Sequence, residues 1–340
     1  MAESVAASDS LPGAPRVAVI VPAYGVAHLV GEALASVQVQ TFSEWECIVV
    51  DDGAPDDVAG AVAPFLNDPR IRFLKTDNGG VSVARNRAIS SCSAQLLTLL
   101  DGDDLLRPEY LATVVPAMEA DPGITIATCN ARIFGAVASE RLCFDGSQPK
   151  GTLHNALDRS FGIYIGSTFR RTDWERAGGF DPAFGVCEDF EMWIRLLMLG
   201  GRAHYIDRVL GEYRVRAGSA SADAARMLLG NLKVYEKAQR TLPADASEQA
   251  LLTTLIATTR EAIAFEHAID RVVDGDTRGG LADLARLRQQ VAGPVWRASF
   301  ALWRLAPALA RPMLRWRRNR HSRGYEPKGL ARLFGKRSAA

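Results

Sequence analysis

Three carboxylates lie within the segment Asp101–Asp104, directly after the short apolar run Gln95–Leu100. Such a run predicts a buried strand of a mainly parallel sheet, and the C-terminal ends of those strands face the ligand crevice. Asp101 and Asp103 are two positions apart, so an extended chain places their side chains on one side, while Gly102 permits close approach of a ligand. Carboxylates in this arrangement suit Mg²⁺ or Mn²⁺ completed by substrate phosphates. The alternative is a solvated Asp-rich turn.

Three earlier apolar runs also end in polar or glycine residues. Any one of these ends alone is typical of a turn, but four of them along one sheet edge predict a nucleotide crevice. Tyr24 is a candidate to stack on a base, and Asp52 to accept a hydrogen bond from a base N–H. The three segments are Pro22-Ala23-Tyr24, Asp51-Asp52-Gly53 and Asn78-Gly79-Gly80.

Strands that alternate with helices must position these residues. The pattern predicts a doubly wound α/β domain with a mainly parallel, Rossmann-like sheet and right-handed crossovers. Arg85, on the helix opened by Gly79-Gly80, is expected to face the diphosphate or ribose, and a surface ion pair is its alternative. The predicted strands are Val17–Val21, Trp45–Val50, Ile71–Leu74 and Gln95–Leu100, and the predicted helices are Val26–Val39, Asp56–Leu66 and Val81–Ser91.

The next hundred residues continue this alternation less regularly. Thr172 is the expected N-cap of a short helix that Gly178-Gly179 ends. Between Ala131 and Leu157 the pattern is weak and indicates short strands and loops. The remaining predicted helices are Pro108–Ala120, Thr172–Ala177 and Glu188–Leu199, and the remaining predicted strands are Ile124–Asn130, Ile163–Arg170 and Ala203–Tyr213.

Composition excludes wholesale disorder and a polytopic membrane protein, because 48% of the 340 residues are hydrophobic and 23% are charged. The net charge of +1 hides a split, since residues 291–340 carry 12 basic residues and one acid. Five cysteines without a CxxC pair indicate free thiols in a reducing compartment. We expect a lead-in at 1–15 that lacks secretory-signal features, a catalytic domain at 16–221, a helical extension at 222–290 and a basic amphipathic tail at 291–340.

Seven ordered segments between residue 16 and about residue 221 resemble the signature segments of family 2 glycosyltransferases with the GT-A fold. A classical dinucleotide-binding dehydrogenase fits worse, because no GxGxxG follows the first strand. The resemblance implies transfer of a sugar, with inversion, from a nucleotide diphosphate sugar to a hydroxyl group. The segments are Val17–Tyr24, Val49–Gly53, Gly79–Asn86, Leu100–Asp104, Gly166–Arg171, Gly178–Asp181 and Cys187–Trp193.

By family frequency the donor is a UDP-sugar, and the acceptor is a glycan or lipid-linked acceptor of cell-surface polysaccharide or glycolipid synthesis. The resemblance assigns Asp103 to a divalent ion that stabilises the departing diphosphate, and Asp101 to contacts with the ribose of the nucleotide or with the metal. It assigns Asp189 to the general base, which the N-terminal dipole of its helix would keep ionised. Glu188 is expected to hydrogen-bond the acceptor. Trp193 is a candidate for the floor of the acceptor pocket, although core packing is the favoured interpretation for it. First-turn acids are also typical of helix capping.

Two positions depart from the family pattern. Gly25 replaces the usual Asn after the first-strand tyrosine, and Arg216 stands where a His is common. An Arg cannot ligate a metal, but its guanidinium matches phosphate oxygens, so Arg216 is expected to clamp the diphosphate. Gly80 and Gly102 complete the predicted nucleotide contacts.

The basic tail has arginines and tryptophans at intervals of seven, which places the three arginines Arg297, Arg304 and Arg311 on one helix face. This favours an interfacial helix over residues 294–323, with tryptophans at headgroup level and the basic stretch Arg315–Arg323 on an anionic membrane. The expected location is the cytoplasm, peripherally on the inner face of the cell membrane. A helical hairpin packed on the catalytic domain is the alternative, and nucleic acid would not need the apolar face.

Two other function classes compete with a glycosyltransferase. A sugar-nucleotide nucleotidyltransferase should carry a basic phosphate loop near the first strand, but residues 22–31 contain no Lys or Arg. A non-catalytic nucleotide-sugar-binding membrane scaffold should show damage to the acidic segments, and both are intact.

Overall fold

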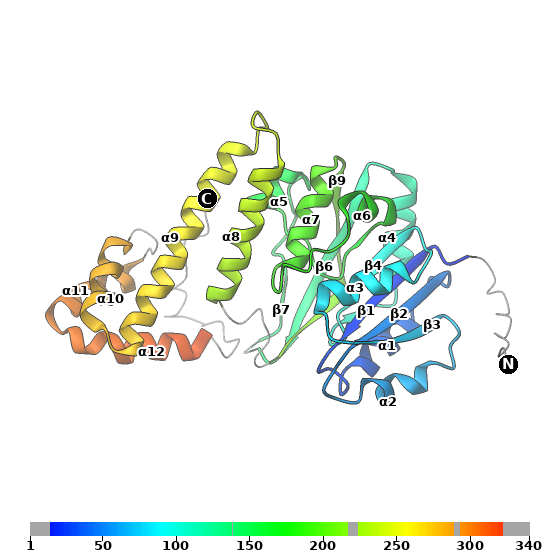
Figure 1. The fold of residues 1–340 in the computed structure, drawn as a ribbon, viewed down its shortest axis with the longest axis horizontal. Helices are drawn as coiled ribbons and strands as arrows, with labels where there is room; N and C mark the ends of the chain where they lie inside the picture. Colours follow the sequence, from blue (N-terminus) through cyan, green and yellow to red (C-terminus); the bar gives the residue numbers. More distant parts are fainter. Residues whose placement is uncertain (1–13, 138, 217–223, 289–292, 322–340) are drawn as a thin grey trace.

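The computed structural model describes residues 14–137, 139–216, 224–288 and 293–321. In these residues nine strands form one mixed sheet, which runs through the right-hand part of the molecule in Figure 1. The strands are β1 (Val17–Ala23), β2 (Trp45–Asp52), β3 (Ile71–Thr76), β4 (Leu96–Leu99), β5 (Leu105–Leu106), β6 (Ile124–Gly135), β7 (Arg141–Leu142), β8 (Thr168–Arg170) and β9 (Arg202–Val215).

The strand order is β3-β2-β1-β4-β8-β6-β9-β5, with β7 paired to β6. Strands β3, β2, β1 and β4 are parallel, β8 is antiparallel to both of its neighbours, and β6 and β9 are parallel to each other. The chain leaves β1 toward β2 and returns to its other side at β4. Ligands of doubly wound sheets bind at this kind of reversal, so the fold places the crevice at the ends of β1 and β4.

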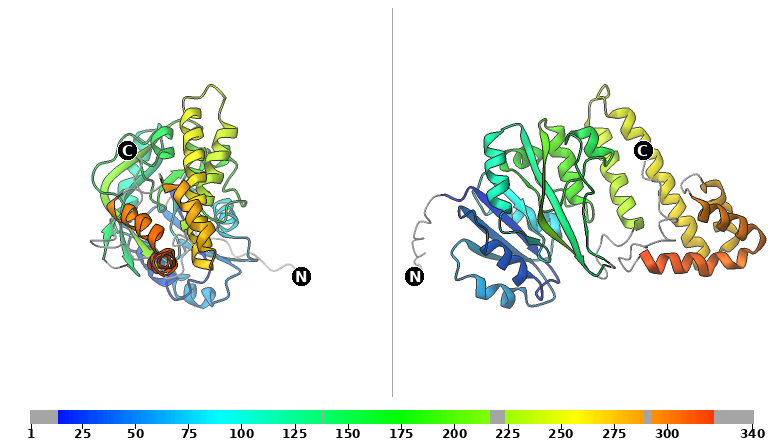
Figure 2. Two further views of the ribbon diagram at one scale, coloured as in Figure 1. Left: turned by 90° about the vertical axis from the view of Figure 1, so that its left-hand side faces the viewer. Right: turned by 180° about the vertical axis from the view of Figure 1, so that it is seen from behind.

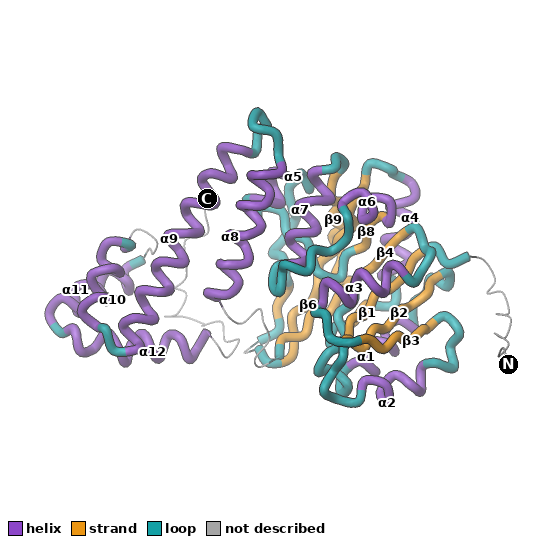
Figure 3. Tube along the Cα trace, in the orientation of Figure 1, coloured by secondary structure: helices purple, strands orange, loops and turns teal. Residues whose placement is uncertain are grey.

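Helices cover both faces of the parallel strands, as Figure 3 shows. In β1 the residues Val17, Val19 and Val21 pack in one core cluster with α1, whereas Ala18 and Ile20 pack in the other with α3. Burial on both faces explains the uninterrupted apolar runs and confirms the expected doubly wound sheet. The helices over the sheet are α1 (Val30–Gln38), α2 (Val58–Val62) with the 3₁₀ turn Ala63–Phe65, α3 (Val81–Ser90), α4 (Tyr110–Ala120), α5 (Leu153–Leu157), α6 (Arg171–Ala177) and α7 (Glu188–Met198).

Three expectations for the second half of the sheet are wrong. Only residues 168–170 of the predicted strand Ile163–Arg170 are extended as a strand, because side chains bind the backbone before it; the Tyr164 N–H, for example, donates to Thr128 Oγ1 over 2.9 Å. Helix α6 begins at Arg171 without a side-chain cap, so Thr172 is not its N-cap. Helix α5, which was not expected, begins where Thr152 accepts a hydrogen bond from the Asn155 N–H.

The C-terminal part is helical, as expected. Helix α9 is 26 residues long, and Leu252 and Ile256 in its first half pack in the core beside α7. Its second half packs with α10 to α12 in a separate cluster, which lies at the far end of α9 from the sheet (Figures 1 and 2). The elements are α8 (Ala224–Thr241), α9 (Gln249–Asp274), α10 (Thr277–Arg286), α11 (Pro294–Leu305), the 3₁₀ turn η4 (Pro307–Leu309) and α12 (Ala310–His321).

This cluster corrects the expectation that the tail tryptophans sit at lipid headgroups. Trp296 and Trp303 are 2% and 3% exposed and pack with Phe265 and Ile269 of α9. The tail helices therefore form a small core on α9 and do not lie against the sheet. No helix in the described part of the chain is both long and apolar enough to span a bilayer. Residues 1–13 of the expected lead-in and residues 322–323 of the expected basic stretch lie outside the described residues.

Candidate active site

A pocket of about 300 Å³ lies at the C-terminal end of β4. The two acidic segments of the sequence both line it, although 85 positions separate them. Asp101 and Asp103 come from the loop after β4, Glu188 and Asp189 from the first turn of α7, and Arg216 from the end of β9. The other described residues that line it are Val81, Ile165, Gly185, Val186, Cys187, Tyr213, Arg214 and Met227.

Arg85 of α3 forms ion pairs with both acidic segments from the interior of the protein. Its side chain is 1% exposed and donates to Asp101 Oδ1 over 2.7 Å and to Glu188 Oε1 over 2.8 Å. Burial alone would lower the pKa of Arg85, but the charges of Asp101 and Glu188 raise that pKa above its ordinary value. This corrects the expectation that Arg85 faces the diphosphate or ribose, because its guanidinium is buried behind the pocket between two carboxylates.

Asp189 is half-buried at the pocket and has an unusual acidity. Burial and the negative charge of Glu188 raise the pKa of Asp189 to about 6, against the opposing positive charge of Arg85. The N-terminal dipole of α7, which was expected to keep the pKa of Asp189 low, is therefore outweighed by burial and by Glu188. A carboxylate with a pKa near 6 is ionised at neutral pH and is a stronger base than an ordinary Asp.

A left-handed residue sets the start of α7. Cys187 is its N-cap and has φ 59°, an uncommon conformation for a residue other than Gly. The Cys187 thiol packs against α8, where its Sγ lies 3.4 Å from Asn231 Oδ1. Because this turn reverses the chain just before Glu188, both acids of the first turn reach the pocket.

Arg216 contacts the residue that was expected to hold the metal. Its Nε lies 2.6 Å from Asp103 Oδ2, and its Nη1 donates to the Gly25 carbonyl over 3.4 Å. The adjacent Asp104 is buried and accepts a hydrogen bond from the Arg214 backbone N–H over 2.7 Å. The loop after β4 is thus bound to the end of β9 at two successive acids, and the diphosphate contact expected of Arg216 stays a prediction.

Asp52 has a structural role in the fold. Its two carboxylate oxygens accept hydrogen bonds from the N–H groups of Gly79 and Gly80 over 2.9 and 2.8 Å, and its side chain is buried. The base contact expected of Asp52 stays a prediction. Gly80 has φ 84° and caps α3, so Asp52 fixes the turn from which α3 starts.

The predicted contacts at the end of β1 differ in accessibility. Tyr24 is 54% exposed, as a base-stacking residue must be in the absence of its ligand. Pro22 and Ala23 pack against Gly102, where an added Cβ would lie 3.0 Å from Val26 and 3.2 Å from the Pro22 carbonyl oxygen. A side chain at Gly102 would therefore push the acidic loop away from β1. The nucleotide role of these residues stays a prediction.

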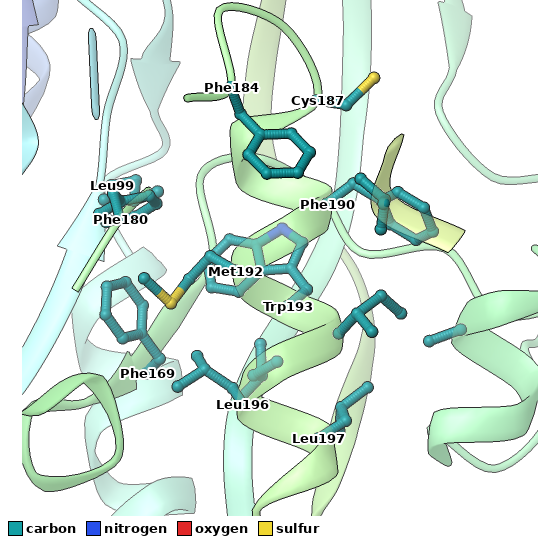
Figure 4. Packing of buried hydrophobic residues seen from close by; sticks show 14 of the residues in the cluster. Leu99, Phe169, Phe180, Phe184, Cys187, Phe190, Met192, Trp193, Leu196 and Leu197 are labelled. Atoms are coloured by element: carbon teal, nitrogen blue, oxygen red, sulfur yellow. The ribbon is translucent and has the colours of Figure 1, made fainter. Parts of the chain in front are cut away.

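Trp193 lies away from the pocket, which corrects its assignment to the acceptor floor. It is 1% exposed and packs edge-on against Phe169, with ring centroids 5.4 Å apart. Figure 4 shows it in the core among Phe169, Met192 and Leu196. Trp193 lies one helical turn after Asp189 and on the same side of α7. Beyond the first turn, however, that side of the helix is buried in the core and does not line the pocket.

The candidate ligands for a divalent ion are the carboxylates of Asp101 and Asp103. Burial and the charge of Asp101 raise the pKa of Asp103, so the two acids repel each other and a cation would relieve this repulsion. Within residues 14–137, 139–216, 224–288 and 293–321 no group of three or more His, Cys, Asp or Glu side chains is placed to hold a metal. Asp101 and Asp103 therefore fit Mg²⁺ or Mn²⁺ only if phosphate oxygens and water complete the shell.

Sequence reasoning missed the residues that join distant elements at this site. Arg214 donates from Nε to the Asp103 carbonyl over 2.8 Å and pairs with Glu32 of α1 over 2.6 Å. Met227 of α8 lines the pocket, so the C-terminal helices contribute to the site. The position of Arg214 in the late Tyr-Arg-Val-Arg segment was the available signal, but its partners lie 111 and 182 positions away.

Comparison with known protein families identifies the chain. Residues 18–171 match the model described as glycosyl transferase family 2, and residues 96–316 match the model described as glycosyl transferase family group 2. Together with the sheet and the paired acidic segments, these matches define a glycosyltransferase with the GT-A fold. The chain belongs to family 2 of the glycosyltransferases.

Several curated relatives are polysaccharide enzymes. The chain is 31% identical over 221 residues to the succinoglycan biosynthesis protein ExoO of Rhizobium meliloti, covering 61% of this chain and 63% of that protein. It is 25% identical over 199 residues to chondroitin synthase of Escherichia coli, covering 58% of this chain and 29% of that protein. The chain thus spans less than two thirds of the length of these relatives.

Solved structures share the fold. TarS 1-349 of S. aureus in complex with UDP-GlcNAc superimposes with a TM-score of 0.63 at 19% identity, covering 91% of this chain and 89% of that one. The mannosyltransferase PcManGT of Pyrobaculum calidifontis, in complex with GDP-Man and Mn²⁺, gives a TM-score of 0.60 at 21% identity, covering 92% and 85%.

Proposed function

We propose that this chain transfers a sugar, with inversion, from a nucleotide diphosphate sugar to a hydroxyl of a glycan or lipid-linked acceptor. The observation that carries the proposal is the pocket, which is lined both by the pair Asp101 and Asp103 and by the pair Glu188 and Asp189. An inverting transfer needs charge stabilisation for the departing diphosphate on one side and a base for the acceptor on the other. The two pairs offer one group for each need.

The acidity of Asp189 supports its role as general base. Its carboxylate, with a pKa raised to about 6, would take the proton from the acceptor hydroxyl while that oxygen attacks the anomeric carbon. Glu188 is fixed by Arg85 and would accept a second hydrogen bond from the acceptor. A carboxylate held in place by a buried guanidinium orients the hydroxyl without moving during the reaction.

The leaving group would depart toward Arg216 and the acidic loop. When bound, a divalent ion held by Asp101 and Asp103 would neutralise negative charge on the diphosphate. Arg216 would exchange its contact with Asp103 for phosphate oxygens, which a guanidinium binds in bidentate fashion. Structural neighbours in complex with UDP-GlcNAc and with GDP-Man support a nucleotide diphosphate sugar, and we propose a UDP-sugar in this chain.

The relatives named for succinoglycan and chondroitin synthesis support a role in cell-surface polysaccharide or glycolipid synthesis. We place the chain peripherally at the inner face of the cell membrane, through its basic C-terminal part at residues 294–323. Eight arginines and no acid lie between residues 294 and 323, and such a segment is attracted by anionic lipid.

A donor screen tests this proposal. The full chain is heated with each of a panel of UDP-, GDP- and dTDP-sugars, with and without Mn²⁺, because a ligand that binds the folded state raises the melting temperature. The sugar that stabilises the chain is then incubated with glycan acceptors, and release of the nucleoside diphosphate is measured. Stabilisation without any transfer, under conditions in which acceptors of many classes are present, would favour the non-catalytic scaffold instead.

A further inference from the structure

A second pocket, remote from the candidate active site, lies in the C-terminal helical cluster. It has a volume of about 720 Å³, is open to solvent on one side, and lies between α10, α11 and the turn η4. These elements stand at the far end of α9 from the sheet (Figure 1). Its wall is mostly apolar, and the residues that form that wall are Leu281, Ala282, Ala285, Phe300, Trp303, Pro307 and Ala308.

Three arginines, Arg278, Arg288 and Arg304, stand at this apolar wall. Each is exposed, and the described residues that line the pocket include no acid. Asp283, the single acid between residues 277 and 321, lies outside the lining and pairs with Arg271 and Arg286. An apolar cavity bordered by cations without acidic partners is complementary to a ligand with a hydrocarbon chain and an anionic head.

The surface beside the pocket is also apolar. Leu305 is 87% exposed, and Leu309 is exposed as well, on the two sides of the lining residues Pro307 and Ala308. Exposed apolar side chains beside an apolar pocket extend the surface on which a hydrocarbon chain can be buried. The pocket therefore opens beside a surface that suits lipid.

From these observations we infer that the pocket between α10, α11 and η4 binds an anionic phospholipid of a bilayer. Its acyl chain lies against Phe300 and Trp303, and its phosphate lies among the three arginines. This site differs from the interfacial helix that the tail sequence suggested, because Trp303 contacts the lipid from within a folded core. The inference does not rest on the proposed glycosyl transfer, since no residue of the pocket belongs to the candidate active site.

Vesicle flotation with the full-length chain tests the inference in the absence of sugar donor. The protein should float with vesicles of phosphatidylcholine and phosphatidylglycerol, and it should remain in the unbound fraction when the vesicles contain phosphatidylcholine alone. Arg278→Ser/Arg304→Ser should lower the partition coefficient about 30-fold, since each arginine near an anionic surface contributes about fivefold. Lys233→Ser/Arg240→Ser removes two exposed charges of α8 and is the matched control, which should bind as the unmodified chain does.

A pocket-filling variant separates the cavity from general charge attraction. Ala285→Trp adds an indole at an exposed position of the lining without changing the net charge, and should also reduce binding about tenfold. If it binds vesicles normally while the double arginine variant does not, charge alone attracts the membrane and the pocket assignment is wrong. Circular dichroism verifies that each variant is folded, and Ala282→Trp replaces Ala285→Trp if the latter is not.

Soluble probes distinguish binding of the lipid's hydrocarbon chain from binding of its phosphate head group. Dodecyl phosphate below its micelle concentration should raise the melting temperature, whereas inorganic phosphate and dodecyl maltoside should not. Stabilisation by inorganic phosphate alone would indicate an anion site that does not bind a hydrocarbon chain, and would contradict the lipid assignment. Equal binding of the protein to an RNA homopolymer and to vesicles would also contradict it. Transfer to a soluble acceptor, measured separately, should be the same in all these variants, so its loss would concern the proposed function and not this site.

Discussion

Nε of Arg216 lies 2.6 Å from Oδ2 of Asp103, so an arginine of the chain itself neutralises an acid expected to hold the metal. The guanidinium and a divalent ion would compete for the same carboxylate. Donor binding can resolve this competition, because the diphosphate offers the guanidinium new partners and the ion new ligands.

Arg216→Ala should therefore raise the KM for the donor about tenfold or more, because a charge-assisted bidentate contact with phosphate is lost. The same variant should bind Mn²⁺ more tightly in the absence of donor, since Asp103 is then unpaired. Steady-state kinetics and titration with Mn²⁺ measure the two effects. Arg208→Ala, an exposed arginine of β9 that donates to Thr113, is the control. Unchanged donor KM in Arg216→Ala would remove Arg216 from the donor site.

Asp189→Asn should abolish transfer while the donor still binds. Loss of a general base costs about 10²- to 10⁴-fold in rate, and the amide keeps the size of the side chain. Turnover and the donor-dependent melting shift are measured on the same preparation. The exposed Glu175→Gln of α6 is the matched control. An Asp189→Asn protein with ordinary turnover would show that another group takes the proton.

The rate should fall as the pH drops through about 6, because Asp189 acts only in its ionised form and its pKa is raised to about 6. The acid limb of kcat/KM against pH measures this value. In Glu188→Gln the limb should move to lower pH, since a negative neighbour that raises the pKa of Asp189 is gone. A limb that stays in place, or moves to higher pH, would contradict the assignment.

Arg85→Met should destabilise the fold by about 3 kcal/mol, because Asp101 and Glu188 would lose the buried cation that they share. Urea unfolding measures the free energy. Arg87→Met, an exposed neighbour on α3, should change it by less than about 0.5 kcal/mol. A loss below about 1 kcal/mol in Arg85→Met would mean that water replaces the guanidinium without difficulty.

Periodicity and strand ends were enough to predict much of this molecule. The buried runs before Pro22, Asp51 and Asp101 are strands of the predicted parallel sheet, since residues buried on both faces leave a plain signal. The pairs Asp101 with Asp103 and Glu188 with Asp189 line one pocket. The sequence could indicate this because the family resemblance rests on several motifs in a fixed order and not on single residues.

The errors share one physical origin. A sequence pattern shows which face a residue is on, but not which distant element covers that face. Arg85 was expected to face the ligand, yet its partners come from β4 and α7. Trp193 lies one helical turn after Asp189 and Trp303 has the spacing of an interfacial helix, but both side chains are buried. The boundaries at residues 16, 221 and 290 stay predictions, and Met227 of α8 already reaches the pocket across one of them.

Helix α9 gives the molecule a fixed internal length. Its 26 residues extend about 39 Å without a break, and its two halves belong to different cores. A continuous helix resists bending far more than a loop of the same number of residues would. It therefore acts as a rigid spacer between the two cores. If a surface binds the C-terminal cluster, the length of α9 also sets the distance from that surface at which an acceptor hydroxyl would reach Asp189.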